Sequence, residues 1–261
     1  MPRIAVTVSA LLVLGIASVV SAAGWTDLFD GRSLDGWEVR SGVATYHVED
    51  GCIVGTTVEK SPNTFLCTKR EYSDFILEFE VKNDPALNSG VQVRSHVYET
   101  ENTQTIERNG KQVKVTNPAG RVYGDQVEIS NETTGTSGGI YGEGRERCWL
   151  ANVAEDPVAR AAFRDNQWNK FRVECVGRTI KTFVNGVPCA TYTEAKDTRG
   201  FIGLQVHAVK GDPKLQVRWR NVRIQELQRP QDEVRRHSAS GSRSGFRGRA
   251  YSRRWSIRHG R

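Results

Sequence analysis

The chain has 261 residues, of which 38% are hydrophobic and 26% charged, with a net charge of +7 at neutral pH. This length and apolar content suffice for one domain with a substantial core. From Gln228 onward there are ten arginines against only Asp232 and Glu233, so the preceding body is slightly acidic. The positive charge therefore belongs to one end of the chain, and we predict no nucleic-acid partner.

Neither end of the chain has the composition of a folded domain. Residues 1–23 combine Arg3, an almost wholly apolar run over 4–20 and small residues, which predicts a signal peptide cleaved before Gly24. An uncleaved membrane anchor is the alternative, because the run approaches the roughly 18 residues of a span. Residues 228–261 predict a disordered basic tail that can touch anionic surfaces. We expect an exported protein, periplasmic, extracellular or at the cell envelope, without a transmembrane span after processing.

The first half of the body alternates between apolar and polar residues, as β-strands do. Trp37 follows two Asp-bearing turns as a large aromatic anchor, and Asp50-Gly51 between two short strands predicts a hairpin. From Phe75 to Val81 every second residue is a large apolar one, with Ile76, Glu78 and Glu80 between them, which predicts a half-buried strand. A further strand, from Val91 to Arg94, follows a turn.

The second half continues this pattern with one exception. Pro157 to Phe163, behind Asp156 as N-cap, is the only predicted helix. Asn185-Gly186 predicts a second hairpin with a type I′ turn. In the last strand the apolar positions change from odd to even numbers, which predicts a β-bulge near Arg220-Asn221. Many short strands with close turns predict an all-β sandwich of two antiparallel sheets.

Five cysteines occur in this chain, which we expect to be exported, and none has CxxC spacing, so a zinc site is unsupported. Their odd number leaves at least one free or paired between chains. Cys175 alternates with apolar neighbours, so we interpret it as a buried small hydrophobe. We predict Cys52 with Cys67 as the first disulfide to test.

The stretch from Ala119 to Leu150 contains the predicted site. In Asp125-Gln126-Val127-Glu128-Ile129, two apolar residues face a core and two polar residues point the other way. The glycine-flanked turn that follows, from Ser137 to Gly142, allows close approach of a ligand. Polar side chains on a strand beside a glycine-rich rim predict a binding face.

Three strands carry a polar pair two residues apart, rich in amides rather than in the plain charges of solvated strands. Amide and guanidinium groups suit hydroxyl-rich ligands, because they donate and accept hydrogen bonds at fixed angles. The alternative interpretation is that these are ordinary strands with one solvent-exposed face, in which polar and apolar residues alternate without any site. The three pairs are Gln92 with Arg94, Gln126 with Glu128, and Gln205 with His207.

Each candidate also has an ordinary structural explanation. His207 is a general base or a structural histidine, and Glu128 is an acid, a base, a metal ligand or a surface carboxylate. Arg94 stabilises an oxyanion or forms an ion pair. Tyr141 stacks on a sugar or donates a proton, or it packs at the rim. Together with these residues, the candidate substrate-binding groups are Gln92, Gln126, Gln205, Asp125 and Gly139.

Eight short segments, in order, resemble the 3-keto-disaccharide hydrolase domain family: LFDGRSLDGW, NSGVQVRS, GDQVEIS, SGGIYGE, QWNKFRVECVG, VNG, LQVHAV and VRWRNVRIQEL. The resemblance covers roughly Trp25 to Leu227, and we place the domain at 24–227. It implies a concanavalin A-like jelly roll with at most one or two short helices. It also implies an exported enzyme that cleaves 3-keto-glycosides by C1–C2 elimination with hydration, or by net hydrolysis.

By this resemblance His207 or Glu128 is the base, Arg94 stabilises the enolate and Tyr141 belongs to the catalytic set. A divalent metal held by Glu128 and His207 is a further expectation, and no other cofactor is implied. Two alternatives use no catalysis. One is a lectin-like carbohydrate-binding module of the cell envelope, and the other is an interaction domain held to a surface by its arginine tail.

Overall fold

In a computed structural model, the structure describes residues 21–22, 24–108, 111–211 and 214–228. The folded body is one compact unit from Ala22 to Leu227. The predicted basic tail lies outside the described residues except for Gln228, and so does the predicted signal peptide except for residues 21–22. No helix among the described residues is long and apolar enough to cross a membrane.

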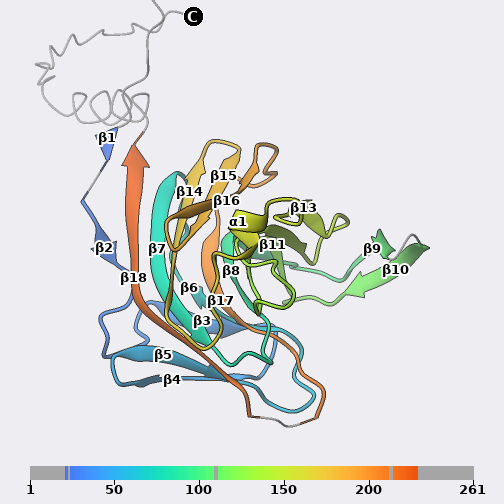
Figure 1. Cartoon of the computed structure of the whole chain (residues 1–261). Helices are drawn as coiled ribbons and strands as arrows, with labels where there is room; N and C mark the ends of the chain where they lie inside the picture. The colour runs from blue at the N-terminus through green and yellow to red at the C-terminus, as the bar shows by residue number, and fades with distance from the viewer. Residues whose placement is uncertain (1–20, 23, 109–110, 212–213, 229–261) are drawn as a thin grey trace, which may run out of the picture. The chain divides into compact units, whose positions relative to one another are not determined.

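The larger sheet has its longest strand, β18, beside β7 at its centre (Figure 1). All its pairings are antiparallel along the main strand order. That order is β16 (Val187–Tyr192), β15 (Thr179–Val184), β14 (Asn169–Val176), β7 (Phe75–Asn83), β18 (Gln216–Gln228), β5 (Cys52–Thr56) and β4 (Thr45–Glu49). The short strand β2 (Thr26–Asp27) also pairs with β18, and β1 (Ser21–Ala22) precedes it.

The second sheet supplies the face on which the candidate site lies, and its strands are also antiparallel. Its order is β13 (Trp149–Ala151), β12 (Ile140–Glu143), β11 (Val122–Ile129), β8 (Ser89–Val97), β17 (Phe201–Val206), β6 (Thr64–Thr68) and β3 (Trp37–Arg40). A separate ribbon of β9 (Asn102–Arg108) and β10 (Lys111–Asn117) extends away from both sheets (Figure 1).

The core fills the space between the two sheets. From β7, Phe75, Leu77, Phe79 and Val81 are at most 1% exposed, because alternate residues of a strand point to one face. The Phe79 ring stacks on Phe171 of β14 at 5.1 Å between centroids. The inner residues of the second sheet complete this core, so the prediction of an all-β sandwich of two antiparallel sheets is confirmed.

The local turns and the helix follow the chemistry of their residues. Asp50 and Asn185 adopt positive φ values of 51° and 50°, each before a glycine, and close the two predicted hairpins. Helix α1 (Pro157–Arg160) begins behind Asp156, whose Oδ1 accepts hydrogen bonds from the backbone N–H groups of the first turn at 2.9 and 3.0 Å. The helix is shorter than predicted, since it ends at Arg160.

The strand register shifts at several places in the two sheets. Two of these bulges, in β18 and β8, concern the predictions made above, and only the one in β18 was predicted. In β18 the shift falls between Arg220 and Arg223, with Asn221 at a φ of 51°, which confirms the predicted bulge. In β8, Arg94 and Ser95 together oppose the single Gly124 of β11, and Arg94 has a φ of 51°. The extra residue ends the alternation of β8 at that point.

The predicted disulfide is wrong, because all five cysteines are free. Cys52 begins β5 in the larger sheet, where its Sγ approaches the Asp50 carbonyl oxygen at 3.6 Å. Cys67 lies in β6 of the second sheet, fully buried. Cys175 lies in the core with no exposed surface, as predicted for a small hydrophobe.

Candidate functional site

Polar side chains gather on the outer face of the second sheet because its strands place them in register. Gln126 of β11 lies opposite Gln92 of β8 and Tyr141 of β12. Glu128 lies opposite Gly90, which in turn lies opposite Gln205 of β17. The intervening residues of these strands point into the core, so the predicted division of β11 into an apolar and a polar face is confirmed.

The polar residues form a continuous chain of hydrogen bonds. The Gln92 Nε2 donates to Gln126 Oε1 at 2.8 Å, and the Gln126 Nε2 donates to Glu128 Oε2 at 3.2 Å. The Asn88 Nδ2 donates to the other oxygen, Glu128 Oε1, at 2.5 Å. Ser95 donates to Gln92 Oε1 at 2.7 Å. Each amide is thereby fixed in orientation, and the Glu128 carboxyl group is held between two donors.

Gly90 makes room for this arrangement. A Cβ atom at position 90 would lie only 2.4 Å from the Cδ of Gln126, far inside van der Waals contact. The side chain of Gln126 therefore lies across the backbone of β8 where only glycine permits it.

A cavity of about 270 Å³ opens above these groups. It brings together four predicted residues, namely Gln126, Glu128, Tyr141 and His207. Sequence reasoning missed the other five lining residues, which are Asn63, Asn88, Arg121, Glu143 and Trp149. A polar cavity with amides, carboxyl groups, an imidazole and two aromatic rings has the side-chain types that bind sugar hydroxyl groups and sugar faces.

Glu128 is the most perturbed carboxyl group of the cavity. Burial raises its pKa to about 7, although the hydrogen bonds from Asn88 and Gln126 lower it; the nearby charge of Glu143 raises it slightly further. The side chain is only 8% exposed. Near neutral pH this group is therefore poised to give or to take a proton.

Glu143 is a second carboxyl group in the same cavity, in a different environment. Arg121 donates to its Oε1 at 2.9 Å, and the Asn63 Nδ2 lies 3.4 Å from the same oxygen. In the sequence, Tyr141 and Glu143 stand two residues apart, as the other polar pairs do. That spacing was the signal that could have identified Glu143.

His207 follows directly after β17 and lines the cavity from that side. Its Nδ1 lies 2.7 Å from the carbonyl oxygen of Ala208. A carbonyl oxygen only accepts, so this contact places the ring proton on Nδ1 and leaves the lone pair of the neutral ring on Nε2. The ring thus has the tautomer of a base that acts through Nε2.

Tyr141 keeps its proton over a wide pH range, because burial raises the pKa of its hydroxyl group and a hydrogen bond with Cys148 raises it further. The Trp149 ring meets the Tyr141 ring edge-on, with 5.4 Å between centroids. The phenol is therefore a hydrogen-bond donor beside an exposed aromatic surface.

The predicted metal ligands, Glu128 and His207, both line the cavity. Within the described part of the chain no group of three or more His, Cys, Asp or Glu side chains is placed to hold a metal ion. Both carboxylate oxygens of Glu128 accept amide hydrogen bonds. A carboxyl group held by these two donors is better suited to proton transfer than to metal coordination.

Arg94 does not belong to the cavity, and its predicted role at an oxyanion is wrong. The bulge turns its side chain into the space between the sheets, where it is 1% exposed. There the guanidinium donates to the Asp74 carboxylate at 2.9 Å and to the carbonyl oxygens of Ser73 and Gly177. Its donors are already occupied by the protein itself.

Four of the five predicted substrate-binding residues do not line the polar cavity. Gln92 is fully buried beside Gln126, to whose Oε1 it donates. Asp125 points away from Gln126, into a different cavity of about 360 Å³, where it lies 3.4 Å from Arg145 Nε. Gly139 leaves space for Trp149, whose ring would lie 3.0 Å from a Cβ there. Gln205 is fully buried, and neither of its amide atoms has a hydrogen-bond partner among the described residues.

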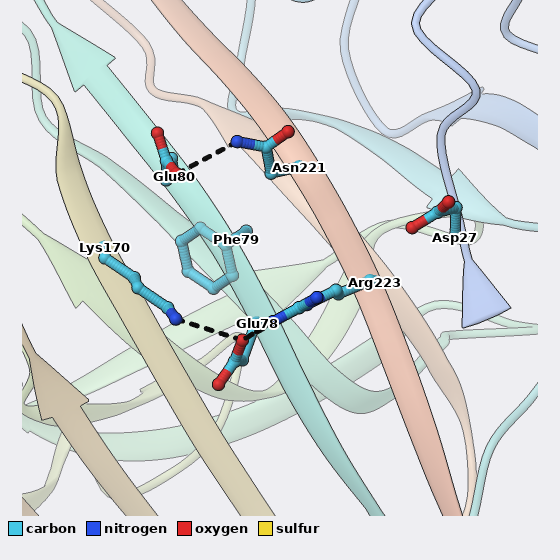
Figure 2. Close-up of a pocket in the computed structure, with 7 residues that line it drawn as sticks. All are labelled: Asp27, Glu78, Phe79, Glu80, Lys170, Asn221 and Arg223. Atoms are coloured by element: carbon cyan, nitrogen blue, oxygen red, sulfur yellow. Dashed lines mark hydrogen bonds and ion pairs between the residues drawn. The ribbon is translucent and has the colours of Figure 1, made fainter. Parts of the chain in front are cut away.

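Another cavity, of about 230 Å³, lies on the outer face of the larger sheet (Figure 2). Figure 2 shows Lys170 and Arg223 directed at Glu78 from the strands on either side, and Asn221 directed at Glu80. Burial alone would raise the pKa of Glu78, but the hydrogen bonds from its three basic neighbours have the larger effect, so its pKa is lowered. Glu78 is therefore neutralised by basic side chains, whereas Glu128 is held by amides.

The fold is similar to that of two solved structures of low sequence identity. A predicted glycosyl hydrolase from Parabacteroides distasonis ATCC 8503 is 18% identical, with a TM-score of 0.51 over 78% of this chain and 94% of that one. A protein of unknown function with a galectin-like fold from Bacillus subtilis is 12% identical, with a TM-score of 0.54 over 81% of this chain and all of that one. At such identities the similarity establishes the fold alone, and it agrees with the predicted jelly roll.

No curated protein matches the sequence significantly. Residues 24–225 match the 3-keto-alpha-glucoside-1,2-lyase-like domain family. This range contains every residue of the cavity, and its amide, carboxyl and aromatic groups suit a sugar. The chain belongs to the 3-keto-alpha-glucoside-1,2-lyase-like domain family, and its function is related to carbohydrates.

Proposed function

We propose that this protein cleaves the glycosidic bond of 3-keto-glycosides in the cavity between Glu128 and His207. The observation that carries the proposal is that a carboxyl group with a pKa near 7 and an imidazole with its Nε2 lone pair available line one small polar cavity. Family membership supplies the substrate class.

The reaction needs a base, an acid and a partner for negative charge. A ketone at C3 acidifies the proton at C2, so a base removes it and the electron pair moves onto the C3 oxygen as an enolate. The enolate then collapses to the ketone, a C1–C2 double bond forms, and the C1–O bond breaks. The leaving oxygen takes a proton and departs as an alcohol. Addition of water across C1–C2 completes net hydrolysis.

The lining residues suit these three tasks. His207 accepts the C2 proton through Nε2, and Glu128, partly protonated near neutral pH, protonates the leaving oxygen. Tyr141, with its raised pKa, and Arg121 donate hydrogen bonds to the enolate oxygen, the task that the sequence analysis gave to Arg94. Asn88 and Gln126 hold the acid in place.

Binding without turnover is the second candidate, because the same ordered amides would also hold a sugar in a lectin-like module. The two functions separate on His207→Ala and Glu128→Gln. Loss of aglycone release with retained sugar affinity supports catalysis. Sugar binding by the parent protein, without aglycone release under any divalent metal condition, supports the binding module.

We also propose that the protein acts after export, as residues 1–23 suggest. Expression of the full chain in a Gram-negative host, with N-terminal sequencing of the periplasmic fraction, tests this. A mature start at Gly24 supports export, and an intact N-terminus in the cytoplasmic fraction contradicts it.

A further inference from the structure

A second and larger cavity, of about 540 Å³, adjoins the polar cavity. Asn63, Arg121 and Glu143 line both cavities, so these three side chains form the boundary between them. A ligand that fills the polar cavity and passes this boundary would place its remaining part in the larger cavity. The proposed chemistry puts a glycosidic oxygen and its leaving group at such a boundary.

The larger cavity is apolar beyond the boundary. Its other lining residues are Ser41, Pro62, Phe65, Pro118, Ala119, Gly120 and Ala208. The Phe65 ring belongs to a small hydrophobic cluster on this same outer face, together with Cys67, Val122 and Phe201. This cluster is buried and separate from the core between the sheets, and its Phe65 reaches the cavity wall.

Most polar side-chain groups of the larger cavity already have partners, although the Nε of Arg121 has none among the described residues. Ser41 Oγ accepts from the backbone N–H of Val122 at 2.7 Å and donates to the carbonyl oxygen of Gly120 at 3.3 Å. The Asn63 Oδ1 accepts from the backbone N–H of Ala208 at 2.9 Å. Arg121 and the Asn63 amide nitrogen are directed at Glu143. A second sugar ring would lose water from its hydroxyl groups here without gaining equivalent partners.

We propose that the larger cavity is an aglycone site and that the preferred substrates are glycosides of flat, aromatic alcohols rather than of a second sugar. This inference rests on the proposed function for the location of the sugar. The exposed residues Pro62, Pro118 and Ala119, with the almost fully buried Phe65 at the wall, offer an aromatic group dispersion contacts and burial. A cavity of about 150 Å³ already accepts benzene, so this one has room for a larger ring system.

The test is isothermal titration calorimetry of the full chain carrying His207→Ala, so that the probes are not cleaved during the titration. Three probes are used, each as both anomers where they exist. They are the 3-keto forms of methyl glucoside, 2-naphthyl glucoside and cellobiose. We expect the naphthyl compound to bind at least about tenfold more tightly than the methyl compound. Equal affinities, tighter binding of the cellobiose derivative, or no binding of the naphthyl compound would overturn the aglycone site.

A variant locates the effect. Ala119→Trp partly fills the larger cavity and removes the naphthyl advantage while leaving the methyl compound unchanged. The exposed Ala161, outside both cavities, gives the matched control Ala161→Trp, which keeps the advantage. The comparison of probes in the His207→Ala protein alone does not depend on the folding of either tryptophan variant. If the naphthyl compound binds more tightly but the parent protein does not cleave it, the proposed reaction fails and the aglycone site stands.

Discussion

The guanidinium of Arg94 lies 2.9 Å from the Asp74 carboxylate, and both side chains are buried between the two sheets. Arg94 comes from the bulge of β8, whereas Asp74 directly precedes β7 of the opposite sheet. The same Asp74 oxygen accepts from the backbone N–H of Gly177 at 3.0 Å. This ion pair therefore connects the two sheets at a point where water cannot solvate either charged group.

Arg94→Met should destabilise the fold without removing catalysis from the molecules that remain folded. Loss of the cation beside a buried carboxylate costs about 3–5 kcal/mol in the free energy of unfolding, measured with urea. The exposed pair of Arg199 with Glu71 gives the control, since Arg199→Met should change stability by less than about 1 kcal/mol. A lower turnover number with unchanged stability would instead indicate that Arg94 takes part in the reaction.

Gly90→Ala should disturb the site by displacing the side chain of Gln126. The added Cβ would lie 2.4 Å from the Gln126 side chain, so that amide must leave its position beside Gln92 and Glu128. We expect kcat/KM to fall about 10- to 100-fold, as for a displaced catalytic group. Gly24→Ala is the matched control, because nothing lies within 4 Å of its added Cβ. Unchanged kinetics in Gly90→Ala would show that Gln126 does not position the acid.

The pKa of Glu128 makes stability depend on pH with a definite sign. The folded state holds the proton up to about pH 7, whereas the unfolded state releases it near the ordinary value of 4.5. Between these values the folded state binds more protons, so rising pH weakens folding, by about 3 kcal/mol in total. Urea denaturation at pH 5 and pH 8 should show this loss in the parent and not in Glu128→Gln. Parallel pH dependence in the two proteins would contradict the raised pKa.

Glu143→Gln should move the pH profile of the reaction. The Glu143 charge contributes to the raised pKa of Glu128, so its removal lets Glu128 lose its proton at lower pH. If Glu128 is the acid, the alkaline limb of kcat/KM, expected near pH 7, shifts to lower pH in this variant. Glu155→Gln, at an exposed position outside the cavity, leaves the limb in place. A shift to higher pH would exclude Glu128 as the proton donor.

The bulges in β18 and β8 show what alternation can and cannot predict. In β18 the apolar residues change parity between Trp219 and Val222, so the extra residue is visible in the sequence. In β8 the alternation is unbroken through Arg94, and Ser95, His96 and Val97 beyond it have no strong parity. The bulge therefore left no signal, and Arg94 was placed on the wrong face.

The cavity residues likewise divide into those that a local sequence pattern predicts and those that it does not. Gln126 and Glu128 could be predicted from one strand, because two residues of spacing put both on one face. Asn63, Asn88 and Arg121 come from three separate connections and meet only through the strand order. That order depends on long-range pairing, which no local pattern contains. The polar pair with Gln205 identified His207 as a candidate, but only the strand order brings it to the same cavity as Glu128.

The central claim is that His207 and Glu128 cleave a 3-keto-glycoside. Its most direct test is mass spectrometry of the products from 3-keto-2-naphthyl glucoside and the purified protein, with and without divalent metal. We predict release of 2-naphthol together with an unsaturated 3-keto-sugar or its hydrate, lost in His207→Ala and Glu128→Gln while calorimetric binding remains. Intact substrate under every metal condition, or full activity in both variants, would contradict this account.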